Sequence, residues 1–166
     1  MQGFAQWLQA TAFSQTVQTV SWVIPLLQSV HILTIGVVFI SSLMIALRVL
    51  GQMRADEPFA AVWQRFAPWM WSGLALMALT GLTLIVGEPV REFTALSFWL
   101  KMSLIVVGIG ATLLYGYRMR APRAGGFSTA AKAASVAIIV LWLTVIFLGR
   151  AIAYDKEVWG SLSLHA

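Results

Sequence analysis

Four stretches of the sequence are mostly apolar over about 20 residues, the length that a helix needs to cross the hydrocarbon core of a membrane. They lie near residues 22–47, 68–87, 96–117 and 130–153. Backbone polar groups in lipid must be paired within the chain, so each stretch is predicted to be helical. The sequence therefore predicts an all-α fold, an integral membrane up-and-down four-helix bundle that occupies residues 22–153.

Composition agrees with this fold class and excludes several others. Hydrophobic residues make up 60% of the chain and charged residues only 10%, far from the roughly 25% charged residues of soluble domains. With 166 residues the chain has room for one domain. Cysteine is absent, which excludes disulfides, thiolate metal sites, iron-sulfur clusters and covalently attached c-type haem.

Residues 1–21 are predicted to form an interfacial amphipathic helix on the membrane surface, with a disordered terminus as the alternative. Phe4, Trp7, Leu8 and Phe13 recur there at near-helical spacing among Gln and Thr residues. No Lys or Arg precedes Arg48, so the basic region of a cleavable signal peptide is missing and we expect the first apolar helix to remain. Tryptophans typical of an interfacial belt fall near the span ends: Trp22, Trp63, Trp69, Trp71, Trp99 and Trp159.

The basic residues predict the orientation, because cytoplasmic loops carry an excess of Lys and Arg. Seven lie around the first and third connections: Arg48, Arg54, Arg65, Arg118, Arg120, Arg123 and Lys132. Four lie at the opposite side: Arg91, Lys101, Arg150 and Lys156. We therefore expect a multi-pass protein of a bacterial inner membrane, with residues 118–128 as a flexible cytoplasmic loop. Both termini, including the tail at residues 154–166, are expected to be extracytoplasmic.

His31 is the most informative polar residue, because ionisable groups inside a span usually face the bundle interior. It lies about 14 Å along the helix from Trp22. A single face of about 140° holds Gln28, His31, Thr34, Ser41 and Ser42. This face is expected to look inward. An imidazole there can ligate haem iron or exchange a proton with a quinone, or it can simply hydrogen-bond to a neighbouring helix.

A second haem ligand is harder to find in the sequence. The other histidine, His165, is the penultimate residue. A second axial ligand would therefore come from His31 of a dimer partner, or from a tail that folds back into the membrane. Otherwise the haem would be five-coordinate.

Lys101 lies about one turn inside the third span, on a face shared with Gly108, Thr112 and Tyr115. The positive end of the helix dipole opposes a cation at that position, so another group is expected to compensate it. Its ammonium could bind an anionic cofactor group, or extend to the outer headgroups as long basic side chains do.

Arg150 lies near the end of the fourth span, and Tyr154 follows one turn later. By the predicted topology, Arg150, Lys101 and Arg91 share the outer side, toward which His31 also lies. Haem propionates, a quinone headgroup or an anionic lipid would suit such a cluster. Arg150 could also serve only as an interfacial anchor.

The segment from Ser21 to Gly51 resembles the opening of a bacterial family of four-helix inner-membrane proteins classed as a domain of unknown function. The matching residues there are Trp22, Pro25, His31, Arg48, Leu50 and Gly51. The similarity continues through Thr80, Gly81, Phe98, Lys101 and residues 149–154, and so covers most of the chain. A more distant similarity runs to copper-resistance membrane domains and to haem-containing membrane protoporphyrinogen oxidase, which pair a first-helix His with a later Lys.

This more distant similarity implies haem b bound through His31. Two departures weaken the transfer of a second haem ligand or a proton relay. Family members often have an acidic residue where this chain has Gln28, and a late third-helix His where it has Tyr115 or Gly116.

The leading hypothesis is a membrane redox or haem-binding protein, with b-type haem or quinone-linked electron transfer. His31 would ligate the haem iron, and the other cofactor-binding residues would be Lys101, Arg150, Gln28 and Tyr154. The alternatives are a non-catalytic anchor or subunit of a larger membrane complex, and a transporter of a small solute or copper. A homo-oligomer or a membrane partner is expected and nucleic acid is not, while enzymatic activity stays open.

Overall fold

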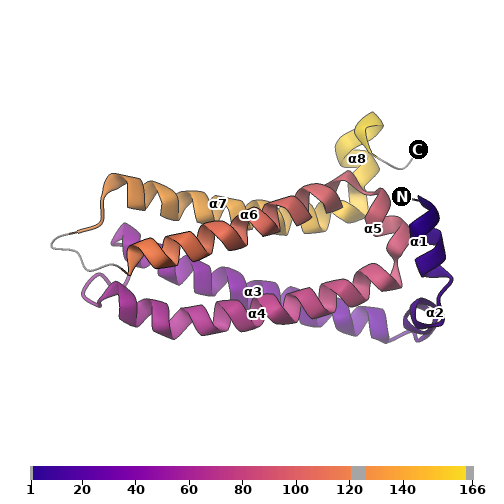
Figure 1. Ribbon diagram of the computed structural model, residues 1–166, viewed down its shortest axis with the longest axis horizontal. Coiled ribbons are helices and arrows are strands. Elements are labelled where there is room, and N and C mark those ends of the chain that lie inside the picture. Colours follow the sequence, from indigo (N-terminus) through magenta and orange to yellow (C-terminus); the bar gives the residue numbers. More distant parts are fainter. Residues whose placement is uncertain (1, 121–125, 164–166) are drawn as a thin grey trace.

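The computed structural model describes residues 2–120 and 126–163. Four long helices form the body of this part of the chain: α3 (Val23–Leu50), α4 (Phe59–Gly87), α6 (Leu96–Met119) and α7 (Thr129–Ala151). All four are long and apolar enough to cross a membrane. They run alternately up and down (Figure 1), and the predicted all-α four-helix bundle is confirmed.

Short helices gather at one end of the bundle, where both chain ends also lie (Figure 1). They are α1 (Gln2–Gln9), α2 (Ala12–Thr19), α5 (Pro89–Thr94), η1 (Ile152–Tyr154), α8 (Asp155–Trp159) and η2 (Gly160–Leu162). The N-terminal segment is helical as predicted, but it is divided into two helices, α1 and α2. The helix stops after Gln9, and a new one starts where the Thr11 hydroxyl accepts a hydrogen bond from Ser14 N at 3.3 Å.

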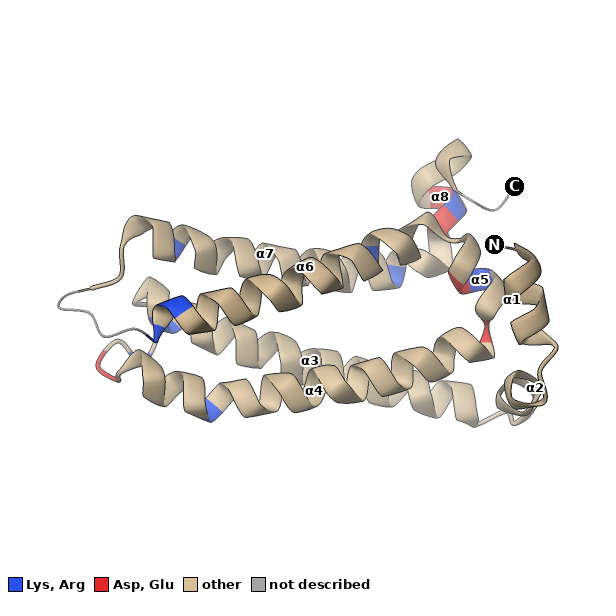
Figure 2. Cartoon of the chain, viewed as in Figure 1, with Lys and Arg blue, Asp and Glu red and all other residues tan. Residues whose placement is uncertain are grey.

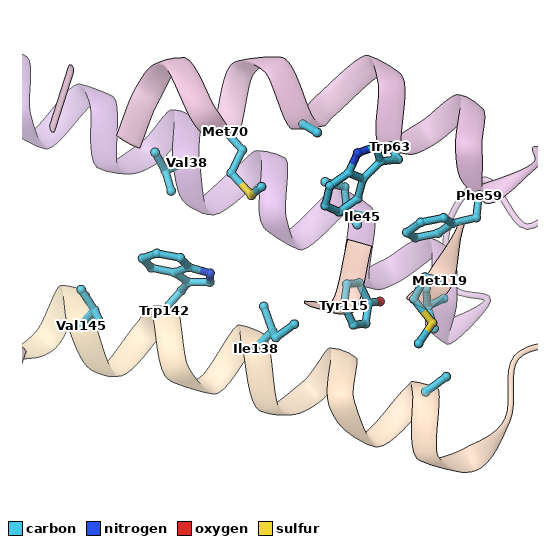
Figure 3. Packing of buried hydrophobic residues seen from close by; sticks show 13 residues of the cluster. Val38, Ile45, Phe59, Trp63, Met70, Tyr115, Met119, Ile138, Trp142 and Val145 are labelled. Carbon is cyan, nitrogen blue, oxygen red and sulfur yellow. The ribbon is translucent and has the colours of Figure 1, made fainter. Parts of the chain in front are cut away.

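The long helices pack as two hairpins, α3 with α4 and α6 with α7, and α3 also packs against α7. The buried cluster between them is shown in Figure 3: Val38, Ile45, Val49, Phe59, Trp63, Ala67, Met70, Tyr115, Met119, Ala131, Ile138, Trp142 and Val145. Glycines allow close approach within each hairpin. A Cβ at Gly73 would lie 2.7 Å from Val38 Cγ2, and one at Gly108 would lie 2.7 Å from Leu141 Cδ2.

Helix α4 begins well before the second predicted span, which started at Pro68. Phe59 and Trp63 are buried in the core, so packing stabilises these early turns although their mean hydropathy is lower. The helix continues through Pro68, where proline removes one intrahelical donor. Helix α3, by contrast, ends at Gly51, whose φ of 75° closes the helix in the left-handed conformation typical of a C-terminal cap.

Charged residues lie mainly toward the two ends of the bundle (Figure 2). At the end opposite the termini, which we call the loop end, Glu57 pairs with Arg54 at 2.5 Å and Arg65 at 3.2 Å. Arg48 Nε donates to the Glu57 backbone carbonyl at 2.5 Å. The hydrogen bond from Arg54 is the main reason why the pKa of Glu57 lies below its usual value. These contacts tie the α3–α4 connection together.

Asp155 holds the tail against the bundle. Its buried carboxylate accepts hydrogen bonds from the backbone N–H groups of Leu96 at 3.1 Å and Ser97 at 2.9 Å, at the N-terminus of α6. Trp159 Nε1 donates to Ser97 Oγ at 2.7 Å. The predicted tail is therefore folded onto the bundle up to Ser163, whereas His165 lies outside the described residues.

Candidate functional site

The His31 imidazole contacts Thr80 on the neighbouring helix. Its Nδ1 lies 2.7 Å from Thr80 Oγ1, and Gly81 lies beside the ring, where a Cβ would come within 3.4 Å of His31 Cε1. His31 is half-buried and Thr80 is buried. The pair thus joins α3 to α4 in the half of the bundle nearer the termini.

The Thr80 hydroxyl controls which ring nitrogen of His31 is free. Thr80 Oγ1 donates to the carbonyl of Leu76 at 2.9 Å. A hydroxyl has one proton, so while it donates to Leu76 it can only accept from His31 Nδ1–H. Nε2 then keeps its lone pair and can bind a metal or a proton. If the hydroxyl instead turns its proton to Nδ1, Nε2 carries the ring proton and becomes a donor.

Lys101 approaches the same region from α6. Its positive charge acts on His31 of α3 and on Glu92 of α5, so Lys101 is in electrostatic range of both groups. The Lys101 side chain passes Gly149, where a Cβ would lie 3.8 Å from Cδ, Cε and Nζ. The ammonium is therefore beside the last turn of α7, whose negative dipole end favours a cation.

Glu92 is the acidic member of this group. It is 8% exposed and lies 3.5 Å from Arg91 Nη2. Burial raises the pKa of Glu92, and the positive charges of Lys101 and Arg91 offset part of that rise. A carboxyl group of this kind can exchange a proton at a higher pH than an exposed glutamate.

The raised pKa of Glu92 gives a testable pH dependence. Between its ordinary pKa and its raised pKa, the folded protein binds more protons than the unfolded chain, so stability falls as pH rises through this window. The contribution of Glu92 to stability is then largest below the ordinary pKa of 4.5. We expect Glu92→Gln to flatten the fall in unfolding temperature above that pH, and the exposed Glu157→Gln to leave it unchanged. Parallel curves for wild type and Glu92→Gln would contradict this assignment.

The remaining predicted site residues, unlike His31, are exposed. The guanidinium of Arg150 lies 5.7 Å from the ring centroid of Tyr154, and both residues are exposed. Gln28 is also exposed, although it was predicted on the inward face. Thr34, Ser41 and Ser42 of that face are buried, as predicted.

The face of α6 that Lys101 was predicted to share with Gly108, Thr112 and Tyr115 is buried at these three residues. Tyr115 is about 21 Å along the helix from Lys101. There its hydroxyl lies 2.6 Å from Ser135 Oγ, and its ring packs against Phe59 at a centroid distance of 6.2 Å. Tyr115 therefore belongs to the loop half of the bundle and not to the His31 site.

Sequence reasoning missed the roles of Thr80 and Glu92. His31 lies about 12 Å from the start of α3 and Thr80 about 10 Å from the end of α4. In antiparallel neighbours these depths match, so a search for polar residues at equal depth could have paired them. Glu92 carried no such signal, because its burial depends on how the short helix α5 folds against α6.

The length and composition of the four long helices indicate a multi-pass helical membrane protein. Near one end it carries a polar group made of His31, Thr80, Lys101 and Glu92. Comparison of the chain with protein-family models, with curated proteins and with solved structures finds no match. The resemblance to the bacterial inner-membrane family therefore stays a prediction based on its motifs.

Proposed function

We propose that this chain is a redox protein of a bacterial inner membrane, which binds haem b or a quinone at His31. The observation that carries the proposal is the 2.7 Å contact between His31 Nδ1 and Thr80 Oγ1, within electrostatic range of Lys101. Metal-binding histidines commonly donate their second ring N–H to such a partner, which fixes the ring and its tautomer.

Residues of α3, α4 and α6 would hold the haem. His31 Nε2 would be the ligand, Thr80 would hold the ring, and the Lys101 ammonium would pair with a propionate. Among residues 2–120 and 126–163 no group of three or more His, Asp or Glu side chains could hold a metal ion. A second copy of His31 would supply the sixth ligand, or that position would stay open for a small molecule.

A bound haem supplies one-electron transfer. The residues of this chain would set the charge around the haem and the exchange of protons near it. Lys101 favours an additional negative charge nearby, and Glu92 can take up or release a proton at the membrane surface. Arg150 and Tyr154 would stabilise anionic groups at the outer edge.

A quinone would suit the same residues if His31 carried its ring proton on Nε2. His31 Nε2–H and the Lys101 ammonium would then donate to a quinone carbonyl oxygen. Measuring the haem and the quinone content of the purified protein distinguishes the two ligands. We expect either a Soret band or a quinone in the lipid extract, in near-stoichiometric amount. Protein that folds but contains neither would contradict the proposal and favour a non-catalytic anchor.

The charge distribution supports an orientation with the loop end in the cytoplasm. By sequence position, the loop end carries seven basic and two acidic residues, whereas the end with the termini carries four of each. The net charge of +5 thus belongs to the loop end. By the positive-inside rule, both termini would lie outside.

The absence of cysteine makes this orientation simple to test. Ser161→Cys and Gln52→Cys introduce single thiols at exposed positions at opposite ends. In intact spheroplasts we expect a membrane-impermeant maleimide to label Ser161→Cys, and to label Gln52→Cys only after lysis. The reverse pattern would contradict the proposed orientation.

A further inference from the structure

A cavity of about 580 Å³ lies at the end of the bundle that carries the termini. Its lining comes from α1 and α2 on one side, through Gln9 and Gln18, and from the start of α3 at Ile24. Glu88, Val90 and Arg91 complete it from the segment between α4 and α6. None of these residues belongs to the His31 group, although Arg91 lies 3.5 Å from Glu92 of that group.

Two contacts build the wall of this cavity on the α2 side. Ser14 Oγ donates to the carbonyl of Val86 at 2.6 Å, which fastens α2 to the end of α4. Gln18 Nε2 donates to Ser14 Oγ at 2.9 Å, which orients the Gln18 amide. Gly87 permits the close approach, because a Cβ there would lie 3.0 Å from Val17 Cγ1.

The charged residues of the cavity form a pair of opposite sign. Arg91 Nη2 lies 2.5 Å from Glu88 Oε2 and 3.5 Å from Glu92 Oε1. Both ion pairs use the same guanidinium nitrogen, and a guanidinium has further N–H donors for an anion. Arg91 and Glu88 remain partly exposed, at 44% and 33% of their side-chain areas. A ligand here therefore meets one cation, one anion and two neutral amides.

The residues around the cavity are typical of the level of lipid headgroups. Phe4, Trp7 and Phe13 on α1 and α2 are 57–63% exposed. Aromatic side chains exposed on short helices at the end of a membrane bundle are typical of the interface. Ile24, in the first turn of α3, gives the cavity an apolar side.

We propose that this cavity binds the headgroup of phosphatidylethanolamine, with the phosphate on Arg91 and the ammonium on Glu88. An anionic lipid would match Arg91 but place its charge against Glu88. A choline headgroup carries a cation without N–H donors and cannot hydrogen-bond to the Glu88 carboxylate. The two glutamine amides can bond to phosphate or ammonium, since each has donors and an acceptor.

Native mass spectrometry of the detergent-purified protein tests this proposal. Titration with phosphatidylethanolamine, phosphatidylcholine and phosphatidylglycerol of equal chain length should show about tenfold tighter binding of the first, as expected for a hydrogen bond to a charged group. Equal binding of the three lipids would overturn the proposal.

Variants locate the site and separate it from other lipid contacts. Glu88→Gln should abolish the preference for ethanolamine over choline, and Arg91→Gln should weaken binding of both lipids. Glu157→Gln, an exposed residue at the same end, is the control. Because both cavity variants remove an ion pair, Gln18→Leu provides a third that keeps it, and it should also weaken binding of the ethanolamine lipid. An unchanged preference in Glu88→Gln and unchanged binding in Gln18→Leu would overturn the assignment.

A soluble headgroup distinguishes a lipid site from a site for a water-soluble ligand. Glycerophosphoethanolamine should bind far more weakly than the intact lipid, because it lacks the chains that partition into the membrane. Binding as tight as that of the lipid would overturn the lipid assignment. No readout here depends on haem or quinone, so this test and that of the His31 proposal can fail separately.

Discussion

Replacing Gly116 by valine should destabilise the bundle by about 1–3 kcal/mol or more. A Cβ at this position would overlap three atoms of the Trp63 ring, which fills the space between α4 and α6. Trp63 cannot easily retreat, because it is 7% exposed and packs against Phe59 at a centroid distance of 5.9 Å. Thermal unfolding in detergent, followed by circular dichroism, measures the loss.

Gly110→Val is the matched control on the same helix. No atom lies within 4 Å of a Cβ built there, so the added methyl groups would point into open space. We also expect Trp63→Leu to rescue part of the Gly116→Val loss, because two residues in contact are energetically coupled. Equal unfolding temperatures for Gly116→Val and Gly110→Val would contradict the packing of α6 against α4.

Replacing Thr80 by valine should weaken cofactor binding by about 10–100-fold, the usual effect of losing the group that orients a metal-binding histidine. Valine has nearly the same shape but cannot hydrogen-bond to His31 Nδ1. Haem or quinone retention after titrated extraction measures this effect. Thr83→Val is the control, since the Thr83 hydroxyl donates to Leu79 O at 3.0 Å on the same helix.

This comparison also separates a binding site from a purely structural contact. If the His31–Thr80 contact only holds α3 to α4, Thr80→Val should lower the unfolding temperature and leave the cofactor content per folded protein unchanged. That outcome would contradict a positioning role for Thr80.

The sequence predicted the helices better than it predicted their contacts. Apolar length was sufficient for the four spans, because lipid leaves the backbone no alternative to a helix. Trp63 shows the limit of this reasoning. Its place near a span end is typical of an interfacial tryptophan, but the absent side chain of Gly116 lets it pack inside. Whether such a residue faces lipid or the core depends on a neighbouring helix.

The candidate site was also only partly predictable, because its contacts depend on how neighbouring helices pack. His31 and Lys101 were expected toward one side of the membrane, and the structure brings them into electrostatic range. Thr80 and Glu92 depend on the rotation of α4 and on the fold of the short helix α5, which hydropathy does not determine. Gln28 is only three residues from His31, yet its side chain is exposed.

The central claim is that His31 contacts the cofactor, and the absorption spectrum of the purified protein tests it most directly. We expect a Soret band in wild type that is lost in His31→Ala and retained in Ser29→Ala, whose exposed hydroxyl donates only to the Pro25 carbonyl of the same helix. For a quinone ligand, the same pattern should appear in the quinone content of the extracts. A folded His31→Ala protein that keeps the wild-type cofactor content would contradict the claim.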